Sequence, residues 1–356
     1  MHILQVSPRY PPATGGIERH VKEIAERLSS RGHDVSVLTT RDGLHSSIDT
    51  ISGTKVTRVP TVAPGGGYHI SPMVATRVRK HDADLVHAHG YHSFPLLFAA
   101  LGAGDKRLVA TPHYLGHGSG LRGVLHDLYR PVGEFALRSA DEVIAVSDWE
   151  RDQLSADFGI DPRVIPNGID VEGFSSADPH QSTDPYIFCA SRLVESKGIQ
   201  YVIDTLVELP DYELYISGTG PYREALEERA IERGVEERVR FVGYVSDDRL
   251  QSLFAGAVCH VTLSEFECYG LTPGESLAAG TPVVVYDRTA LSDWTNYEGC
   301  IGVDHRDPTT VAQAIRTAAD HTPSPAEVPR WDDVVDRIDD VYLEILRQSD
   351  RAVKDQ

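Results

Sequence analysis

Lysine is nearly absent from this chain, and the overall charge is strongly acidic. The 356 residues include 34 basic side chains, of which six are lysines, so that 34 − 6 = 28 are arginines. With 53 acidic residues, the formal net charge is −19. Nucleic acid is therefore not expected as a partner, because binding to a phosphate backbone requires a basic face.

An acidic composition with so few lysines resembles that of proteins from salt-loving archaea, whose hydrated acidic surfaces tolerate molar salt. A merely acidic cytosolic protein is the alternative. One segment departs from the trend: residues 68–138 carry eight Lys/Arg and five Asp/Glu, so that 8 − 5 = +3, and they hold eight of the sixteen histidines. We expect this part of the surface to meet an anion.

Long apolar runs and paired cysteines are also missing. No stretch reaches the roughly 18 apolar residues of a membrane span, and the start, MHILQVS, lacks the basic segment of a secretory signal. The four cysteines show no C-x-x-C spacing, which favours buried, reduced thiols over a disulfide or a zinc site. These features predict a cytoplasmic protein.

The length allows two domains, and an alternation of strands and helices runs through the chain twice. Strands are predicted at residues 2–7, 33–40, 55–60, 83–90, 107–113 and 141–147, and again at 186–193, 212–220, 239–244, 257–264 and 282–287. This pattern predicts an α/β protein with two doubly wound parallel sheets that face a central cleft. We expect a first domain over 1–170, a Ser/Asp/Pro-rich linker over 171–185, a second domain over 186–330, and a C-terminal helix and tail over 331–356, the helix packing back on the first domain.

Ligands of such sheets bind at the carboxyl ends of the strands, and the unusual polar residues of this chain follow predicted strands. In SRLVESKG, Arg192 and Lys197 come after the first strand of the second domain. Lys197 is the only lysine between Lys106 and Lys354. A point charge beside an arginine fork suits a phosphate, although a solvated loop pair would also explain the two residues.

Glycines follow other predicted strands. Gly15 and Gly16 open the first helix, so that bare N–H groups and the positive end of the helix dipole point toward the strand ends. Gly218 and Gly220, in SGTGP, would let the backbone approach a nucleotide. Tight turns alone would also require glycine.

Glu267 and Glu275 lie in SEFECYGLTPGESLAAGTP, ahead of an apolar strand. Thr272, Pro273 and Glu275 fit a capping box, with Thr at the N-cap, Pro at N1 and Glu at N3. A capping role is one explanation for a glutamate at position 275. The other is that its carboxylate binds the two hydroxyls of a ribose. Glu267 is predicted to lie in a loop before Gly270, where its carboxylate can accept hydrogen bonds from sugar hydroxyls.

With these motifs the chain resembles glycosyltransferase family 4, retaining enzymes of the GT-B fold. The resemblance covers nearly the whole chain: PPATGGIERHV matches the glycine loop, VIPNGID the interdomain segment with Asn167, SRLVESKG the diphosphate pair, FVGYVSDDRL the base-side loop, and SEFECYGLTPGESLAAGTPVV the signature with two glutamates. Three positions depart from the family pattern, namely Leu263 for proline, Tyr269 for phenylalanine and Gly274 for a bulkier residue. They bear on the choice of donor more than on activity.

The resemblance implies a metal-independent enzyme without a cofactor, which moves a hexosyl group from a UDP- or GDP-linked sugar to a glycan, a lipid-linked or a small-molecule acceptor in cell-surface polysaccharide, glycoprotein or glycolipid assembly. It implies catalytic roles for His113 near the reacting carbon, Glu267 at the donor sugar, and Arg192 and Lys197 at the diphosphate. A structural role is the alternative for His113. The residues implied to bind the donor or its nucleotide are Gly15, Gly16, Gly218, Gly220, Val242, Gly243, Tyr244, Tyr269, Gly270, Leu271 and Glu275.

The histidines His87, His89 and His92 invite a metal interpretation, since strand alternation places His87 and His89 on one face. HAHG is also a pattern of the family without a metal role. Asp82 and Asp84 do not form a convincing D-x-D motif, because Asp84 directly precedes a buried strand. No metal site is predicted.

Other activities stay open at this point. A sugar-nucleotide epimerase shares the fold but needs no acceptor, and a non-catalytic nucleotide-sugar sensor would have no use for His113. A phosphorylase with pyridoxal phosphate on a lysine is disfavoured by the scarcity of lysine. A nicotinamide dehydrogenase is disfavoured because G-x-G-x-x-G is missing after the first strand.

The segment GLRGVLHDLYRP places apolar residues on one helical side, with arginines nearby: Leu121, Val124, Leu125 and Leu128, beside Arg122 and Arg130. One interpretation is a helix at the inner face of the membrane or against a lipid-phosphate acceptor. The other is an ordinary core helix of the first domain.

Overall fold

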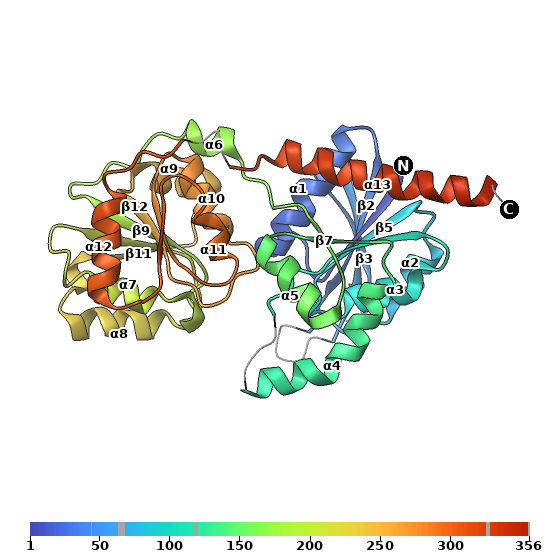
Figure 1. The fold of residues 1–356 in the computed structure, drawn as a ribbon, viewed down its shortest axis with the longest axis horizontal. Coiled ribbons are helices and arrows are strands. Elements are labelled where there is room, and N and C mark those ends of the chain that lie inside the picture. The colour runs from blue at the N-terminus through green and yellow to red at the C-terminus, as the bar shows by residue number, and fades with distance from the viewer. Residues whose placement is uncertain (44, 63–67, 117–119, 325–327, 355–356) are drawn as a thin grey trace. The chain divides into compact units, whose positions relative to one another are not determined.

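Figure 1 shows the computed structural model of the protein, which describes residues 1–43, 45–62, 68–116, 120–324 and 328–354, without the side chains of 120–125 and 349–354. The chain divides into two compact units. Unit 1 comprises Met1–Asn167 and Trp331–Gln356, and unit 2 comprises Gly168–Arg330. The chain therefore leaves unit 1 after Asn167 and returns to it at Trp331.

The described residues of unit 1 form an eight-stranded sheet in the order β3-β4-β2-β1-β5-β6-β7-β8. Its strands are β1 (His2–Ser7), β2 (Asp34–Arg41), β3 (Ser47–Ile51), β4 (Thr54–Pro60), β5 (Leu85–His89), β6 (Arg107–Thr111), β7 (Glu142–Ala145) and β8 (Arg163–Val164). The pairings between them are parallel, except that β3 runs antiparallel to β4. The strand order reverses between β1 and β5, so the topological switch point of unit 1 lies at the carboxyl ends of these two strands.

Two layers of helices bury the faces of this sheet. One apolar core joins the sheet to α1 (Gly16–Ser30) and α13 (Trp331–Lys354). The other joins it to α2 (Met73–Lys80), α3 (Pro95–Ala103), α4 (Gly120–Arg138) and α5 (Asp148–Phe158). Burial of apolar side chains on both faces is what an interior parallel sheet requires.

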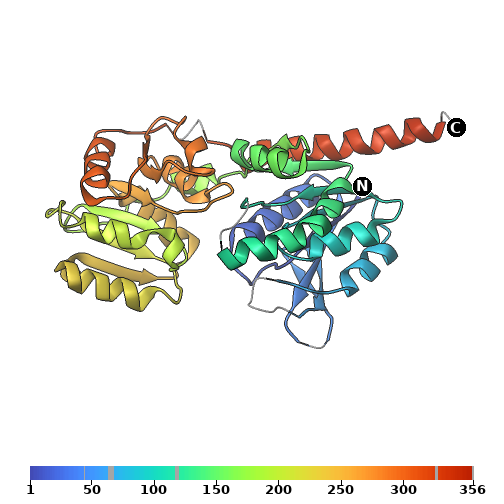
Figure 2. The ribbon, with the colours of Figure 1, turned by 60° about the horizontal axis from the view of Figure 1, so that its bottom comes forward.

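The C-terminal helix α13 belongs to unit 1 and runs beside α1, as Figures 1 and 2 show in red and blue. Its side chains Val335, Ile338 and Tyr342 lie in the same core as those of α1. At the surface, Arg27 and Arg31 of α1 form ion pairs with aspartates of α13. Although it is the last helix in the sequence, α13 is an integral part of unit 1.

Unit 2 contains a sheet of six strands, all parallel, in the order β11-β10-β9-β12-β13-β14. The strands are β9 (Tyr186–Ala190), β10 (Glu213–Ser217), β11 (Val239–Gly243), β12 (Cys259–Thr262), β13 (Val283–Tyr286) and β14 (Cys300–Val303). The helices are α6 (Val171–Ser175), α7 (Ile199–Thr205), α8 (Arg223–Arg233), α9 (Asp247–Gly256), α10 (Leu271–Ala278), α11 (Leu291–Trp294) and α12 (Pro308–Ala318). Here the order reverses between β9 and β12, which places the switch point of unit 2 at their carboxyl ends.

The predicted class, an α/β protein with two doubly wound sheets, is confirmed, and the differences concern short elements. The first sheet is not wholly parallel, because β3 and β4 form a hairpin whose loop residues Ser52 and Gly53 both have positive φ. The stretch 171–185, predicted as a linker, begins with the short helix α6. The four cysteines are free, and Cys189 and Cys259 are buried as expected.

Candidate active site

The charged residues predicted to hold a donor lie in two loops at the switch point of unit 2. The loop after β9 carries Arg192 and, on a 3₁₀ turn at Glu195–Lys197, Lys197. The loop after β12 carries Glu267 and Gly270 and leads into α10. In a doubly wound sheet these two loops border the crevice in which ligands bind.

Close backbone packing holds the two loops together. The backbone N–H of Glu265 donates to the carbonyl oxygen of Ser196 at 2.8 Å. Gly198, at φ +72°, comes so close to Leu263 that a Cβ added to it would lie 2.2 Å from the leucine carbonyl oxygen. Glycine is therefore required at the end of the 3₁₀ turn both for its φ and for the space.

Lys197 and Glu267 form an ion pair across the switch point, although they are 70 residues apart in sequence. The ammonium Nζ donates to Oε1 of Glu267, and the two side chains are 16% and 21% exposed. The prediction that Glu267 lies in a loop is confirmed. Arg192 is exposed, and its guanidinium has no hydrogen-bond or ion-pair partner among the described residues. The site thus combines a half-buried carboxylate and ammonium with an available arginine.

The glycine turn after β10 supports the loop that carries Arg192. Gly218, at φ +131°, would place a Cβ 1.8 Å from the carbonyl oxygen of Ser191, and Gly220 would place one 2.2 Å from that of Leu193. The N–H of Leu193 in turn donates to the carbonyl oxygen of Thr219 at 2.9 Å. Close packing therefore requires glycine at both positions, whether or not the turn also contacts a nucleotide.

The capping box predicted at Thr272 is wrong. Helix α10 begins at Leu271 with Gly270 as its N-cap. Thr272 and Pro273 are therefore the second and third residues of the helix. Gly270 has φ +78°, a conformation that favours glycine and starts the helix earlier than the threonine. Glu275, 3% exposed, is buried and is the fifth residue of the helix, not the third.

Trp294 of α11 contacts two of the positions that depart from the family pattern, Tyr269 and Gly274. The indole N–H donates to the carbonyl oxygen of Tyr269 at 2.9 Å, and the two rings pack edge to face. A Cβ on Gly274 would lie 2.5 Å from the same indole and 2.8 Å from Ile169. The large tryptophan therefore occupies the space that a bulkier residue at position 274 would need.

The predicted base-side residues lie at the end of β11. Gly243, at φ +71°, turns the chain and accepts a 2.8 Å hydrogen bond from the N–H of Gly218 through its carbonyl oxygen. Val242 is half-buried, while Tyr244 beyond the strand is 67% exposed. The exposed phenol ring offers a surface for stacking.

In unit 1, the predicted residues lie around the ends of β1, β5 and β6. Helix α1 begins at Gly16 with Gly15 as its N-cap, as expected. His113 follows β6 and has φ +48°, which is uncommon for a side chain with a Cβ, and it is 6% exposed. Asn167, the last residue of unit 1 before unit 2, accepts a hydrogen bond from Nδ1 of His20 at 2.6 Å through its amide oxygen.

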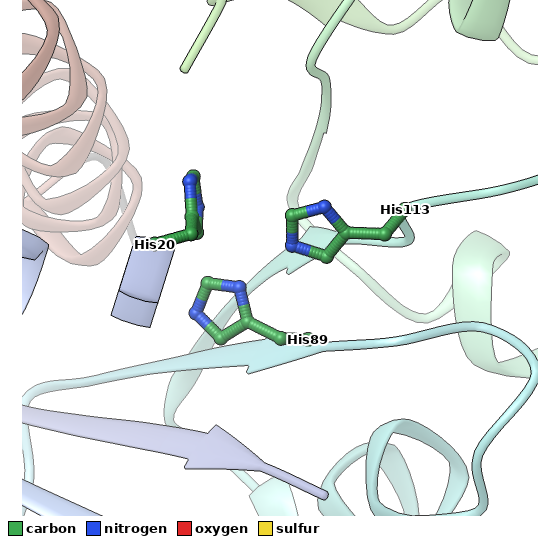
Figure 3. Close-up of side chains that lie close together, drawn as sticks. All are labelled: His20, His89 and His113. Atoms are coloured by element: carbon green, nitrogen blue, oxygen red, sulfur yellow. The ribbon is translucent and has the colours of Figure 1, made fainter. Parts of the chain in front are cut away.

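The histidines combine differently from the trio considered in the sequence. His87 and His89 share a face of β5, as expected, with ring centroids 4.2 Å apart. His92 lies elsewhere and accepts a hydrogen bond from the N–H of Leu115 at 3.3 Å. Instead, His89 lies with His20 and His113, as Figure 3 shows. Sequence analysis missed His20, because helical spacing on α1 gave no sign that it would face β5.

The pair Asp82 and Asp84 is placed away from these strand ends. The carboxylate of Asp84 accepts a hydrogen bond from the backbone N–H of His2 at 2.8 Å. Both residues precede β5 and so lie at the amino ends of the strands, opposite the switch point. This agrees with the prediction that they form no D-x-D motif.

Comparison with known proteins identifies the family. The model for Glycosyltransferase Family 4 matches residues 14–172, and that for Glycosyl transferases group 1 matches residues 171–328. A phosphatidyl-myo-inositol mannosyltransferase from Mycolicibacterium smegmatis is 31% identical over 306 residues, which cover 82% of this chain and 77% of that protein. The chain belongs to glycosyltransferase family 4. It is therefore a glycosyltransferase, and the resemblance read from its motifs is confirmed.

Solved structures show that this family 4 enzyme has the GT-B fold. A sucrose-phosphate synthase from Thermosynechococcus elongatus superposes with a TM-score of 0.81 at 20% identity, covering 98% of this chain and 99% of that one. The Anabaena protein HepE, solved with UDP-glucose, gives a TM-score of 0.79 at 20% identity, over 97% and 100% of the two chains. Within the described residues, no helix is long and apolar enough to cross a membrane.

Proposed function

We propose that this glycosyltransferase moves a hexosyl group from a UDP- or GDP-linked sugar to a glycan, a lipid-linked or a small-molecule acceptor, and retains the anomeric configuration. The observation that carries the proposal is the Lys197–Glu267 pair at the switch point of unit 2. It offers one group suited to phosphate and one suited to sugar hydroxyls. The complex of HepE with UDP-glucose, in a protein of the same fold, supports a nucleotide-sugar donor.

In this proposal the protein's own cations meet the charge that develops on the departing nucleotide diphosphate. Lys197 is held in place by Glu267 and Gly198, and Arg192 follows β9 on the same loop with its guanidinium available. Because these donors are positioned before the reaction, they need little reorganisation as the bond breaks. Each such donor typically lowers the barrier by about 3–4 kcal/mol. We therefore propose a transfer that requires no metal ion at the diphosphate.

Glu267 is proposed to hold the sugar. One of its carboxylate oxygens accepts from Lys197, which leaves further lone pairs for sugar hydroxyls beside the amides of Tyr269 and Gly270. Glu275 and Leu271, on α10, are proposed to border the ribose. Attack from the face that the diphosphate leaves would then retain the configuration at the anomeric carbon.

The remaining predicted residues complete the proposal. Val242, Gly243 and Tyr244 would meet the base, and Gly218 and Gly220 would let the backbone approach the nucleotide. In unit 1, Gly15 and Gly16 at the start of α1, and His113 after β6, are proposed to contact the acceptor and the reacting sugar.

Helix α4 supports a lipid-linked acceptor and peripheral contact with the cytoplasmic face of a membrane. Leu128, Val132 and Phe135 recur at i, i+4 and i+7 and are 78%, 39% and 50% exposed. The predicted residues Leu121, Arg122, Val124 and Leu125 lie outside the described side chains. We expect liposome flotation to recover the protein with anionic vesicles, and a triple serine variant of the three exposed residues to lose this recovery. Wild-type protein that stays wholly unbound would contradict the contact.

The donor assignment is tested by a thermal-shift screen of UDP-, GDP- and ADP-sugars in high salt. Ligand at about 100 times its Kd stabilises the fold by about 2.7 kcal/mol. We expect a UDP- or GDP-sugar to raise Tm in wild type and not in Lys197→Ala. Proton NMR of the product formed with the active donor then reports the anomeric configuration. Turnover with and without added Mg²⁺ or Mn²⁺ tests independence from a metal at the diphosphate. Conversion of the donor without any acceptor would favour an epimerase instead.

A further inference from the structure

Three histidine side chains converge in the interior of unit 1. His20 comes from α1, His89 from the end of β5, and His113 from the residues after β6. One ring nitrogen of each lies within 4.8 Å of those of the other two. All are buried, at 2%, 0% and 6% exposure, and Figure 3 shows the rings turned toward one another. Side chains from three elements thus meet at the switch point between β1 and β5.

Hydrogen bonds to amide oxygens fix the protonation of two of these rings. Nδ1 of His20 lies 2.6 Å from the amide oxygen of Asn167, and Nε2 of His89 lies 2.8 Å from that of Gln5. Gln5 is itself oriented, because its amide nitrogen donates to the hydroxyl of Tyr342 at 3.2 Å. An amide oxygen can only accept, so these ring nitrogens carry the protons. The other nitrogen of each ring is therefore a bare lone pair.

Those lone pairs have no hydrogen-bond partner among the described residues. Nε2 of His20, Nδ1 of His89 and Nε2 of His113 are all buried and unbonded. Buried polar atoms of native proteins are nearly always satisfied, so a group of unbonded ring nitrogens at one place calls for a ligand. Those of His20 and His89 are lone pairs, and that of His113 is a third when its ring carries the proton on Nδ1.

We propose that His20, His89 and His113 bind one divalent transition-metal ion, of which Zn²⁺ is the best match. Three neutral imidazoles with an open fourth position are a known zinc ligand set. Bonds of about 2.0–2.1 Å place ligand nitrogens about 3.4 Å apart in a tetrahedron, so small side-chain rotations would close the site. Asn167 and Gln5 would act as the outer groups that accept the second N–H of each ligand. The ion would tie α1 to the ends of β5 and β6.

This site lies in unit 1 and goes beyond the proposed transfer reaction. The cations proposed to meet the diphosphate, Arg192 and Lys197, belong to unit 2 and take no part in it. Nε2 of His113 would bind the ion, which leaves Nδ1 of the same ring for a substrate. Loss of the ion therefore leaves the proposed diphosphate contacts of unit 2 in place.

The test uses untagged full-length protein, stripped with a chelator and titrated with Co²⁺ and Zn²⁺. We expect one Co²⁺ per chain, with the intense visible absorption of a tetrahedral site, and displacement by Zn²⁺. His20→Ala and His89→Ala should each weaken binding more than 10-fold, and Gln5→Ala by about 10-fold. The exposed His305 provides the matched control, and His305→Ala should bind as wild type does.

Two outcomes would overturn the proposal: wild-type protein that takes up no stoichiometric Co²⁺, or a His89→Ala variant that circular dichroism shows to be folded and that binds as much as wild type. The wild-type titration decides even where a variant does not fold. The Tm shift with the donor sugar, repeated in chelator, reports on unit 2. If that shift persists while metal uptake fails, the metal site is refuted and the proposed transfer is not.

Discussion

The two units wind their sheets in the same way, yet opposite kinds of side chain lie at their switch points. Between β9 and β12, unit 2 places a half-buried ion pair, Lys197 with Glu267, beside an exposed arginine. Between β1 and β5, unit 1 places buried imidazoles. Topology therefore sets where a site lies, and the side chains near the strand ends set its chemistry: charged groups in one unit and imidazoles in the other.

Buried carboxylates repeat the contrast. In unit 2, Asp204 is bound by Arg229 through both oxygens, at 2.6 and 2.7 Å, and by Arg233 at 2.9 Å. In unit 1, Glu150 is fully buried, and among the described residues its carboxyl group accepts hydrogen bonds from the backbone N–H groups of Tyr114 and Val146, at 2.5 and 2.6 Å. Cations therefore hold the carboxylate of Asp204, whereas backbone dipoles hold the carboxyl group of Glu150.

The largest effect is expected where the charges of unit 2 are removed. Lys197→Ala and Glu267→Ala should each lower turnover at least about 100-fold, because contacts made in the transition state are lost. Steady-state kinetics with the active donor measure this. Lys106→Ala in unit 1 and Glu265→Ala in the neighbouring loop are the matched controls and should keep near-wild-type rates. Full activity in either site variant would remove the functional difference between the two switch points.

A second, smaller effect concerns the buried acid of unit 1. Burial raises the pKa of Glu150 from 4.5 to about 8, against the two backbone N–H bonds that lower it. A raised pKa in the folded state means that the stabilisation is complete below about pH 4.5 and is lost as the pH rises toward 8. Between pH 5 and pH 7 wild type should therefore lose on the order of 2 kcal/mol relative to Glu150→Gln.

Urea unfolding of both proteins at several pH values, with hydrogen exchange to separate the units, measures the difference. Glu134→Gln, at a partly exposed acid of α4, is the control and should follow wild type. If the free energy of unfolding depends on pH in the same way for wild type and Glu150→Gln, the two N–H groups stabilise the ionised carboxylate as well as water does. The contrast with Asp204 would then be contradicted.

The smallest effect tests the support of the Arg192 loop. Gly218→Ala would bring a Cβ against the carbonyl of Ser191 and should lower the free energy of unfolding of unit 2 by more than about 1 kcal/mol beyond Gly234→Ala. Gly234 also has a positive φ, +66°, but its Cβ would meet open space. Chemical denaturation of the two variants isolates the clash. Equal destabilisation would show that only the backbone angle matters at position 218.

Most of the fold could be read from the sequence because apolar runs and helical spacing mark buried strands and amphipathic helices. The residues of β1, β2 and β13 were found within one residue at each end. The strand β3, SIDTI, was missed because it lies at an exposed sheet edge and has little apolar pattern. The two-residue strand β8 is too short to give any periodicity.

The charged site of unit 2 could be anticipated because its residues lie in loops directly after strands, where sequence order gives spatial position. The pairing of Lys197 with Glu267 could not, since it depends on which strands become neighbours. The N-cap of α10 was predicted at Thr272 because a threonine side chain can accept a hydrogen bond from the first turn. The N-cap is Gly270 instead, because the chain takes a positive φ there. The histidine cluster of unit 1 depends on α1 crossing the end of β5, which no local pattern records.

The insertion of unit 2 between Asn167 and Trp331 has a consequence for synthesis on the ribosome. The core of unit 1 needs Val335 and Tyr342 of α13, and the Tyr342 hydroxyl bonds His87 at 2.6 Å. These residues are translated after the whole of unit 2. The first part of unit 1 is therefore made before unit 2 but completed after it, and a chain truncated before residue 331 should carry a finished second unit beside an unfinished first one.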